Sequence, residues 1–142
     1  MQHLQGDRVV KLGIPSALNA FLIAVGRVAL ASLFVLGGVN KLLNFSTTAQ
    51  RMSVAGLVPA QLLLPLTIFL ELGAGMLLAR GGRWAWPAGL ALALFTITTN
   101  VVFHRFWELS GPLRGLELSL FFKNISIAGA LLYCAAAEKA KL

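Results

Sequence analysis

Long apolar runs, each broken by only a few polar residues, dominate this sequence. Crossing the hydrocarbon core of a bilayer, which is about 30 Å thick, takes roughly 20 consecutive apolar residues in a helix. Four runs reach that length, at about residues 17–43, 58–79, 84–103 and 118–137. The alternating pattern of membrane-barrel strands is absent from the sequence. The pattern therefore predicts an all-α fold, an antiparallel up-and-down bundle of four transmembrane helices with short loops.

The segments between the runs are short and predict that consecutive helices are neighbours. We expect loops at residues 44–57, 80–83 and 104–117. The second loop has room only for a tight turn, so the second and third helices form an antiparallel hairpin. Trp84 and Trp86 follow this turn, and Trp107 lies beyond the other end of the third helix, as expected of aromatic residues at the two headgroup layers.

Small residues at regular spacing mark the faces on which we expect the helices to pack. Ala85, Gly89 and Ala93 recur at every fourth position, which places them on one face of the third helix. Small residues on one face allow two membrane helices to approach closely. Glycines in the second and fourth helices offer similar contacts: Gly73, Gly75 and Gly129.

Composition supports the membrane interpretation and excludes several classes of protein. Apolar residues make up 58% of the chain and charged residues only 12%, against about 45–50% and about 25% in a typical soluble domain. Such hydrophobicity also excludes an intrinsically disordered chain. The net charge is +7, but the basic residues are scattered, so we expect them to contact the anionic membrane surface and not nucleic acid. The single cysteine, Cys134, cannot form a disulfide within the chain.

The distribution of lysine and arginine sets the expected orientation. One side of the membrane would carry Arg8, Lys11, Arg80, Arg83, Lys139 and Lys141, and the other Lys41, Arg51, Arg105 and Arg114. This bias places both termini in the cytoplasm, with residues 1–16 as an N-terminal segment suited to the membrane surface and residues 138–142 as a tail. A signal peptide cleaved at residues 29–31 is the alternative, but Arg27 falls where such a peptide is uncharged.

Two charged residues fall deep within the predicted spans and give the first indication of function. Arg27 lies about 15 Å into the first helix, and Glu71 lies about 20 Å into the second, which runs in the opposite direction. A charge at the centre of a bilayer costs about 2.5–3.5 kcal/mol, so such residues face a partner or a cavity. We therefore expect Arg27 and Glu71 to pair, directly or through a ligand. The pair would either fix the packing of the helices or form the floor of a binding site.

Further polar residues cluster toward the outer ends of the helices. They are Lys41 in the first helix, Asn100 and His104 in the third, and Lys123 and Asn124 in the fourth. Together with Arg27 and Glu71 they predict a polar recess open to the periplasm, although the lysines would alternatively snorkel to the headgroups. This set contains three cations (Arg27, Lys41 and Lys123) and one acid, Glu71. Because the recess is therefore positively charged, it suits a small anion or a quinone headgroup. His104 would exchange protons there, since histidine titrates near neutral pH.

The sequence contains no motif for a resident cofactor. Glycine-rich phosphate loops, HExxH and CxxC are all missing, and the single deep carboxylate offers no metal cage. His3 lies outside the predicted spans and cannot join His104 in holding a haem. We therefore expect no metal and no built-in redox centre, and quinone is the cofactor class that the recess favours.

Five segments match the pattern of a known family: GRVA at residues 26–29, GGVNKL at 37–42, ELGAG at 71–75, HRFW at 104–107 and FFKNISIAG at 121–129. On these motifs the sequence resembles the DoxX family of small bacterial inner-membrane proteins, from about residue 24 to residue 133. The resemblance implies a four-helix bundle with both termini in the cytoplasm and an association with oxidoreductase chemistry. Relatives include subunits linked to quinone reduction by thiosulfate, and a membrane partner of sulfurtransferase and superoxide dismutase. The chain departs from the family pattern before Gly37, where Val35 and Leu36 replace the usual tyrosine and histidine. The motifs alone therefore do not assign a specific quinone-oxidoreductase role to this chain.

These inferences favour a membrane-embedded component of a quinone-linked redox system. It would bind a quinone or small anion in the outer-half recess and work with soluble or membrane redox partners. Whether the chain itself turns over a substrate stays open. Two further hypotheses belong to different classes of protein: an oligomeric transporter or exporter of small solutes, and an accessory subunit whose buried charges only hold a membrane complex together.

Overall fold

A computed structural model of the chain describes residues 15–141. The described residues form four long helices, one short helix and one 3-10 turn, and they form no strand. The long helices are α1 (Ser16–Leu43), α3 (Ala60–Arg80), α4 (Ala85–Phe103) and α5 (Gly111–Lys139), and the short elements are α2 (Phe45–Val54) and η1 (Phe106–Glu108). Each long helix is long and apolar enough to cross a membrane, which confirms the predicted all-α membrane fold.

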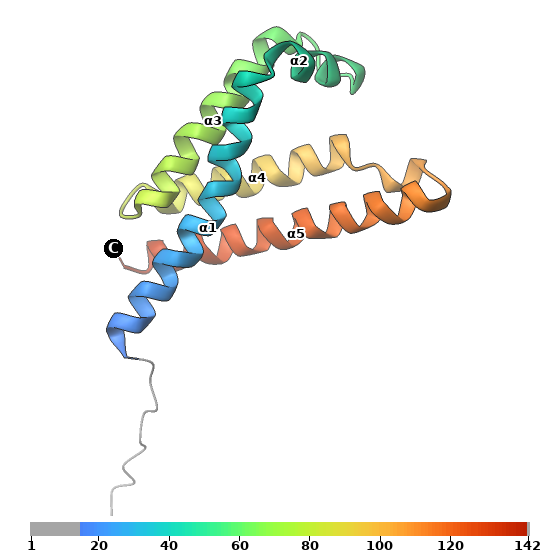
Figure 1. The fold of residues 1–142 in the computed structure, drawn as a ribbon. Helices are drawn as coiled ribbons and strands as arrows, with labels where there is room; N and C mark the ends of the chain where they lie inside the picture. Colours follow the sequence, from blue (N-terminus) through green and yellow to red (C-terminus); the bar gives the residue numbers. More distant parts are fainter. Residues whose placement is uncertain (1–14, 142) are drawn as a thin grey trace, which may run out of the picture.

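The long helices form two antiparallel pairs (Figure 1). α1 packs against α3, α4 packs against α5, and the contact of α3 with α4 joins the two pairs. The pairs lie together where α3 turns into α4 and α5 ends, with the first turns of α1 extending beyond this region, and they diverge toward α2 and η1. We call these two ends of the molecule the termini end and the α2 end. A cavity lies between the pairs at the α2 end.

Two glycines set the close contact between α1 and α3. A Cβ atom added to Gly38 would lie 2.9 Å from side-chain atoms of Leu72, and one added to Gly75 would lie 2.9 Å from the Val35 side chain. The helices therefore approach one another through positions that tolerate no side chain. The prediction of a packing role is confirmed for Gly75, but at Gly73 an added Cβ would meet nothing within 4 Å.

The predicted small-residue face of α4 does pack, and its partner is α5. Ala85, Gly89 and Ala93 are all buried. A Cβ atom added to Gly89 would lie 3.1 Å from the Cβ of Ala135 across the interface. A Cβ atom added to Gly129 of α5 would have no neighbour within 4 Å, so the prediction that Gly129 serves as a packing glycine is wrong.

The prediction of a loop over residues 44–57 is wrong, because most of the segment forms α2. Phe45, Ala49 and Met52 recur at helical spacing and share one face. Ala49 and Met52 are buried with residues of α3 in a small separate core. The helix is only 10 residues long and its other face is polar, so it gives a weak hydrophobic signal.

α5 begins earlier than the apolar pattern indicates. The helix starts at Gly111 rather than near residue 118, and Pro112 stands in its first turn, where the N–H group that proline lacks is not needed. The connection from α4 is correspondingly shorter and contains η1. Glu117 consequently lies on a helix that faces α4, instead of in a loop.

The outward faces of the helices are suited to lipid tails. Leu36 in α1, Phe69 in α3 and Tyr133 in α5 are each at least two-thirds exposed. In water such a surface would be a liability, whereas a bilayer covers it. The predicted surface segment at residues 1–16 lies almost wholly outside the described residues.

Candidate functional site

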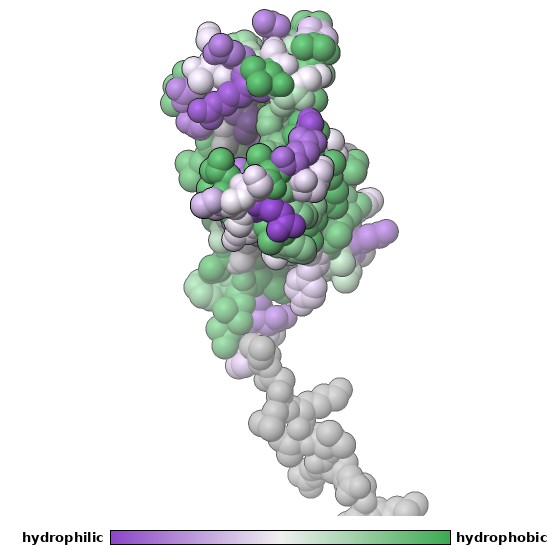
Figure 2. All heavy atoms as spheres, turned by 90° about the vertical axis from the view of Figure 1, so that its right-hand side faces the viewer, coloured by the Kyte–Doolittle hydropathy of each residue, from purple (hydrophilic) through white to green (hydrophobic). Residues whose placement is uncertain are grey.

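A cavity of about 290 Å³ lies at the α2 end, between the two helix pairs. All α-helices except α5 contribute side chains to it, together with Leu57 and His104, which lie in connections. The lining residues are Lys41, Thr48, Arg51, Met52, Leu57, Thr67, Glu71, Phe95, Thr99, Phe103 and His104. Figure 2 views this side of the molecule, with hydrophilic side chains gathered over α2 at the top and over the α4–α5 connection in the middle.

An ion pair between Lys41 and Glu71 forms the charged wall of the cavity. Lys41 Nζ donates to both carboxylate oxygens of Glu71, at 2.9 Å to Oε1 and 2.8 Å to Oε2. Glu71 lies mid-helix in α3 with only 6% of its side chain exposed, whereas Lys41, in the last turn of α1, is 27% exposed. A lysine ammonium has three N–H donors, so the pair leaves one donor of Lys41 for a ligand.

A second polar pair joins α4 to α5 beside the cavity. His104 follows the last residue of α4, and its Nδ1 lies 2.7 Å from Oε2 of Glu117. In the tautomer with a proton on Nδ1, that N–H donates to the carboxylate, which fixes the ring and leaves Nε2 without this contact. Both side chains are 25% exposed, so the pair lies between the cavity wall and the outside. Glu117 was not anticipated from the sequence, because the segment was expected to be a loop.

The rest of the lining combines hydroxyl groups with apolar and aromatic side chains. Thr48, Thr67 and Thr99 donate their hydroxyl hydrogens to carbonyl groups of their own helices or the preceding turn, which leaves their oxygen lone pairs as acceptors. Phe95 and Phe103 supply aromatic surface from α4. A small organic ring with polar substituents therefore fits this wall better than a hydrated ion does.

The charges that line the cavity sum to a positive excess. Lys41 and Arg51 are cationic, and Glu71 is the one acidic lining residue. Arg51 is exposed at the rim on α2, and it makes no ion pair with any residue between 15 and 141. The cavity therefore favours an electron-rich ligand.

The predicted pair of Arg27 with Glu71 is wrong. Arg27 Nη1 instead lies 3.0 Å from Oε1 of Glu138, and Arg27 Nε donates to the carbonyl oxygen of Ala79 at 3.2 Å. The estimate of depth from the sequence assumed that α1 and α3 begin and end at the same heights in the membrane, and they do not. Arg27 is level with the last turn of α3, and the beginning of α1 extends past that turn, so Lys41 comes level with Glu71.

The structure does not bring the remaining predicted recess residues to the cavity. Asn100 is fully buried between α4 and α5, where it donates to the Phe121 carbonyl oxygen at 3.1 Å and accepts from Asn124 at 3.0 Å. These bonds join the two helices. Lys123 is exposed and does not line the cavity. The cavity thus contains Lys41, Glu71 and His104 of the predicted set, and their roles in binding stay predictions.

Glu108 lies in η1, beyond the end of α4 at Phe103, and it pairs with Arg105 at 3.4 Å. Between residues 15 and 141, no group of three or more histidine, cysteine or acidic side chains is placed to hold a metal ion.

The sequence is similar to one protein family and to two bacterial inner membrane proteins. The sequence model of the DoxX family matches residues 22–105, a segment that includes Lys41, Glu71 and His104. The chain is 29% identical to the inner membrane protein YphA of Escherichia coli (strain K12) over 119 residues, which is 84% of each chain. It is 34% identical to the inner membrane protein YqjF of the same organism over 113 residues, covering 80% of this chain and 81% of the relative. No solved structure matches the chain significantly.

Proposed function

This chain belongs to the DoxX family, and on that basis we propose that it binds a quinone headgroup in the cavity at the α2 end, as a membrane component of a quinone-linked redox system. The similarity to inner membrane proteins and the four apolar helices support a place in the bacterial inner membrane. The excess of basic residues at the termini end supports a cytoplasmic location for both termini.

One observation carries the proposal: a single cavity combines a spare cationic donor, a histidine and aromatic walls. Lys41 has one N–H left to donate to a quinone carbonyl oxygen, and Phe95 and Phe103 offer faces for the ring. The volume of about 290 Å³ is at the lower limit for ligand pockets, which suits a headgroup whose tail stays in the bilayer.

The same residues can serve the protons of quinone reduction. Conversion of a quinone to a quinol takes up two electrons and two protons, which bond to the carbonyl oxygens. The electrons come from a partner redox protein, whose reduced centre is oxidised in the step. His104 passes protons to the bound ring and regains them from outside through Glu117, with which it lies in hydrogen-bond contact. The chain itself acts as the binding and proton-exchange component.

A small inorganic anion is the second candidate ligand. The positive excess from Lys41 and Arg51 favours it, because the one lining carboxylate is already paired with Lys41. The aromatic walls give an inorganic anion nothing to bind, which is why we rank the quinone first. A structural accessory subunit would not require Lys41 to bind a ligand, so a test of Lys41 bears on that alternative.

Photolabelling tests the proposal. The purified full chain in lipid nanodiscs is exposed to an azido-ubiquinone with a short tail, and the labelled peptides are identified by mass spectrometry. We expect label on residues 48–57 and 95–104. Lys41→Met should reduce this labelling at least fivefold, and Lys123→Met, which changes an exposed lysine outside the cavity, should leave it unchanged.

The outcome separates the candidates. Labelling spread evenly over the lipid-facing helices, or equal labelling of wild type and Lys41→Met, would exclude a quinone site here. If sulfate binds to the wild type, requires both Lys41 and Arg51, and no cavity labelling occurs, the small-anion function replaces the quinone function.

A further inference from the structure

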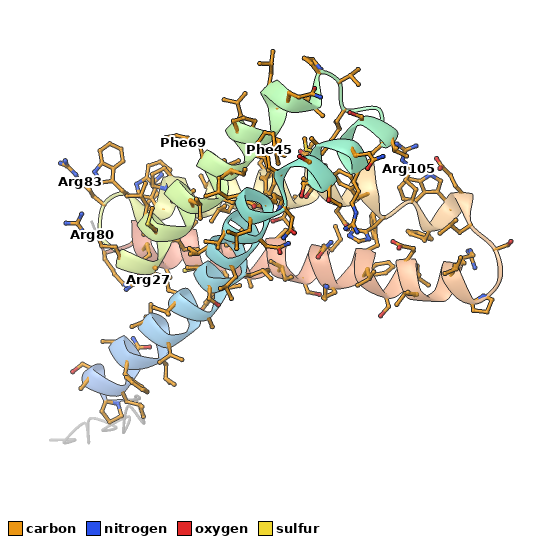
Figure 3. The ribbon with its side chains drawn as sticks, turned by 45° about the horizontal axis from the view of Figure 1, so that its top comes forward. Arg27, Phe45, Phe69, Arg80, Arg83 and Arg105 are labelled. Carbon is orange, nitrogen blue, oxygen red and sulfur yellow. The ribbon has the colours of Figure 1, made fainter. Side chains whose placement is uncertain are left out.

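A second polar site lies at the opposite end of the molecule, in the turn between α3 and α4. A hollow of about 400 Å³ is lined there by Leu77, Arg80, Gly81, Gly82, Arg83 and Trp84. The two glycines have φ angles of +80° and +82°, a conformation that favours glycine and reverses the chain within four residues. As a result the two arginines flank one small hollow. Figure 3 shows both at this end, on the side of the molecule away from Arg105.

The cations around this turn are not neutralised within the described part of the chain. Arg80, Arg83 and Lys139 are exposed and make no ion pair with any residue from 15 to 141. The one acidic residue described at this end is Glu138, whose side chain is only 2% exposed. Arg27, Lys141 and the Gly82 N–H group already bond to its carboxylate. The described residues at this end therefore present a net positive surface that attracts anions.

The aromatic side chains beside this positive surface are typical of the edge of a bilayer. Arg83 lies 5.2 Å from the ring centre of Trp84, and Lys139 lies 5.0 Å from that of Trp86. Tryptophan prefers the headgroup layer, and a cation over its face is stabilised by the ring. Leu77 and the exposed ring of Trp84 add apolar surface to the hollow. A ligand that fits must be anionic at one end and apolar at the other.

We propose that the turn between α3 and α4 is a binding site for an anionic phospholipid. Its phosphodiester group lies between Arg80 and Arg83, and its glycerol and upper acyl region contact Trp84 and Leu77. Guanidinium groups suit this role because they form paired hydrogen bonds to phosphate oxygens. The excess positive charge selects lipids with a net negative headgroup over zwitterionic lipids that carry the same phosphate. This proposal does not depend on the ligand of the cavity at the α2 end.

Native mass spectrometry of the full chain tests the proposal, in mixed micelles with equal amounts of phosphatidylglycerol and phosphatidylcholine. We expect the wild type to retain phosphatidylglycerol preferentially. The double variant Arg80→Gln with Arg83→Gln should lose this preference at least fivefold. The matched control, Arg105→Gln with Arg114→Gln, removes the same charge at the α2 end and should retain it. Helical circular dichroism and the elution volume verify that each variant is folded.

Two further measurements decide the identity of the ligand. A photoreactive phosphatidylglycerol added to the wild type should crosslink to residues 77–86, a result that does not depend on any variant. Inorganic phosphate at millimolar concentration should not displace the lipid. Crosslinks confined to other helices, an unchanged preference in the turn variant or an equal loss in the control would overturn the proposal. Displacement by inorganic phosphate would show a site for free anions instead.

Discussion

Arg27 and Glu138 stand 111 positions apart in the chain, yet Nη1 of the arginine lies 3.0 Å from Oε1 of the glutamate. The other carboxylate oxygen, Oε2, accepts the N–H of Gly82 at 3.3 Å. Arg27 also donates to the carbonyl of Ala79. One ionic cluster thus ties the first helix, the α3–α4 turn and the end of the last helix together. It closes the termini end, while the α2 end stays open around its cavity.

Replacing Glu138 by Gln should destabilise the fold by about 3 kcal/mol, because it leaves Arg27 part-buried without a counter-charge. Arg27 has only 14% of its side chain exposed. Unfolding of the detergent-solubilised protein by added dodecyl sulfate measures the change. Glu108→Gln is the control, since its exposed pair with Arg105 should contribute at most about 0.5 kcal/mol. Equal losses in the two variants would contradict a special role for the termini-end cluster.

Gly81→Ala should be more destabilising than Gly82→Ala. Both glycines have positive φ, and Gly81 also has a ψ of −171°, a combination found essentially only in glycine, so an alanine there costs roughly 1–3 kcal/mol in backbone strain. At Gly81, however, the new Cβ would lie 2.5 Å from Nη1 of Arg27, whereas at Gly82 it would meet nothing within 4 Å. The Gly81 variant should therefore also displace Arg27 from Glu138. Midpoints in the same unfolding assay compare the two, and equal midpoints would show that the Arg27 contact has no effect.

The Lys41–Glu71 pair predicts strong coupling between substitutions. Glu71 is the more buried partner, so Lys41→Met should cost about 3 kcal/mol by leaving a buried carboxylate unpaired. Adding Glu71→Met should restore most of that loss, because apolar side chains replace a buried ion pair at little cost. A double-mutant cycle on unfolding free energies gives the coupling. Losses that simply add would mean that the two side chains do not pair in the membrane.

Glycine-to-alanine changes on α3 should differ by position. Gly75→Ala should destabilise by about 1–3 kcal/mol, because its Cβ would overlap the Val35 side chain. Gly73→Ala, half a turn away, enters open space and should be neutral or stabilise the helix by up to about 1 kcal/mol. Thermal unfolding in one detergent compares the pair. A Gly73 variant as unstable as the Gly75 variant would contradict this helix register.

Hydropathy was sufficient to predict the four long helices, since a membrane span needs a length of apolar sequence that few other structures have. It did not reveal α2, whose buried face consists of Ala49, Met52 and a part-buried Phe45 in an otherwise polar segment. The start of α5 was also missed. Its first turns carry Arg114 and Glu117, and charges of this kind resemble a loop in a hydropathy pattern.

The candidate site was predicted in part. Depth along each helix brought Lys41, Glu71 and His104 into consideration, and these three do line one cavity. The partners of the charges could not be predicted, because they depend on how far one helix is shifted along another. Glu138 was assigned to a tail, yet it is buried against Arg27. A charged residue near the end of an apolar run gives no indication of whether it turns inward.

α1 is too long to stand upright in a bilayer. Its 28 residues span about 42 Å, whereas the 19 residues of α4 span about 29 Å, close to the thickness of the hydrocarbon layer. A helix that exceeds this thickness tilts or emerges at one surface. Arg27 is level with the end of α3, so the turns before it form the excess. Thinner membranes would expose more of these turns, and the lean of α1 against the shorter α3 should therefore vary with lipid chain length.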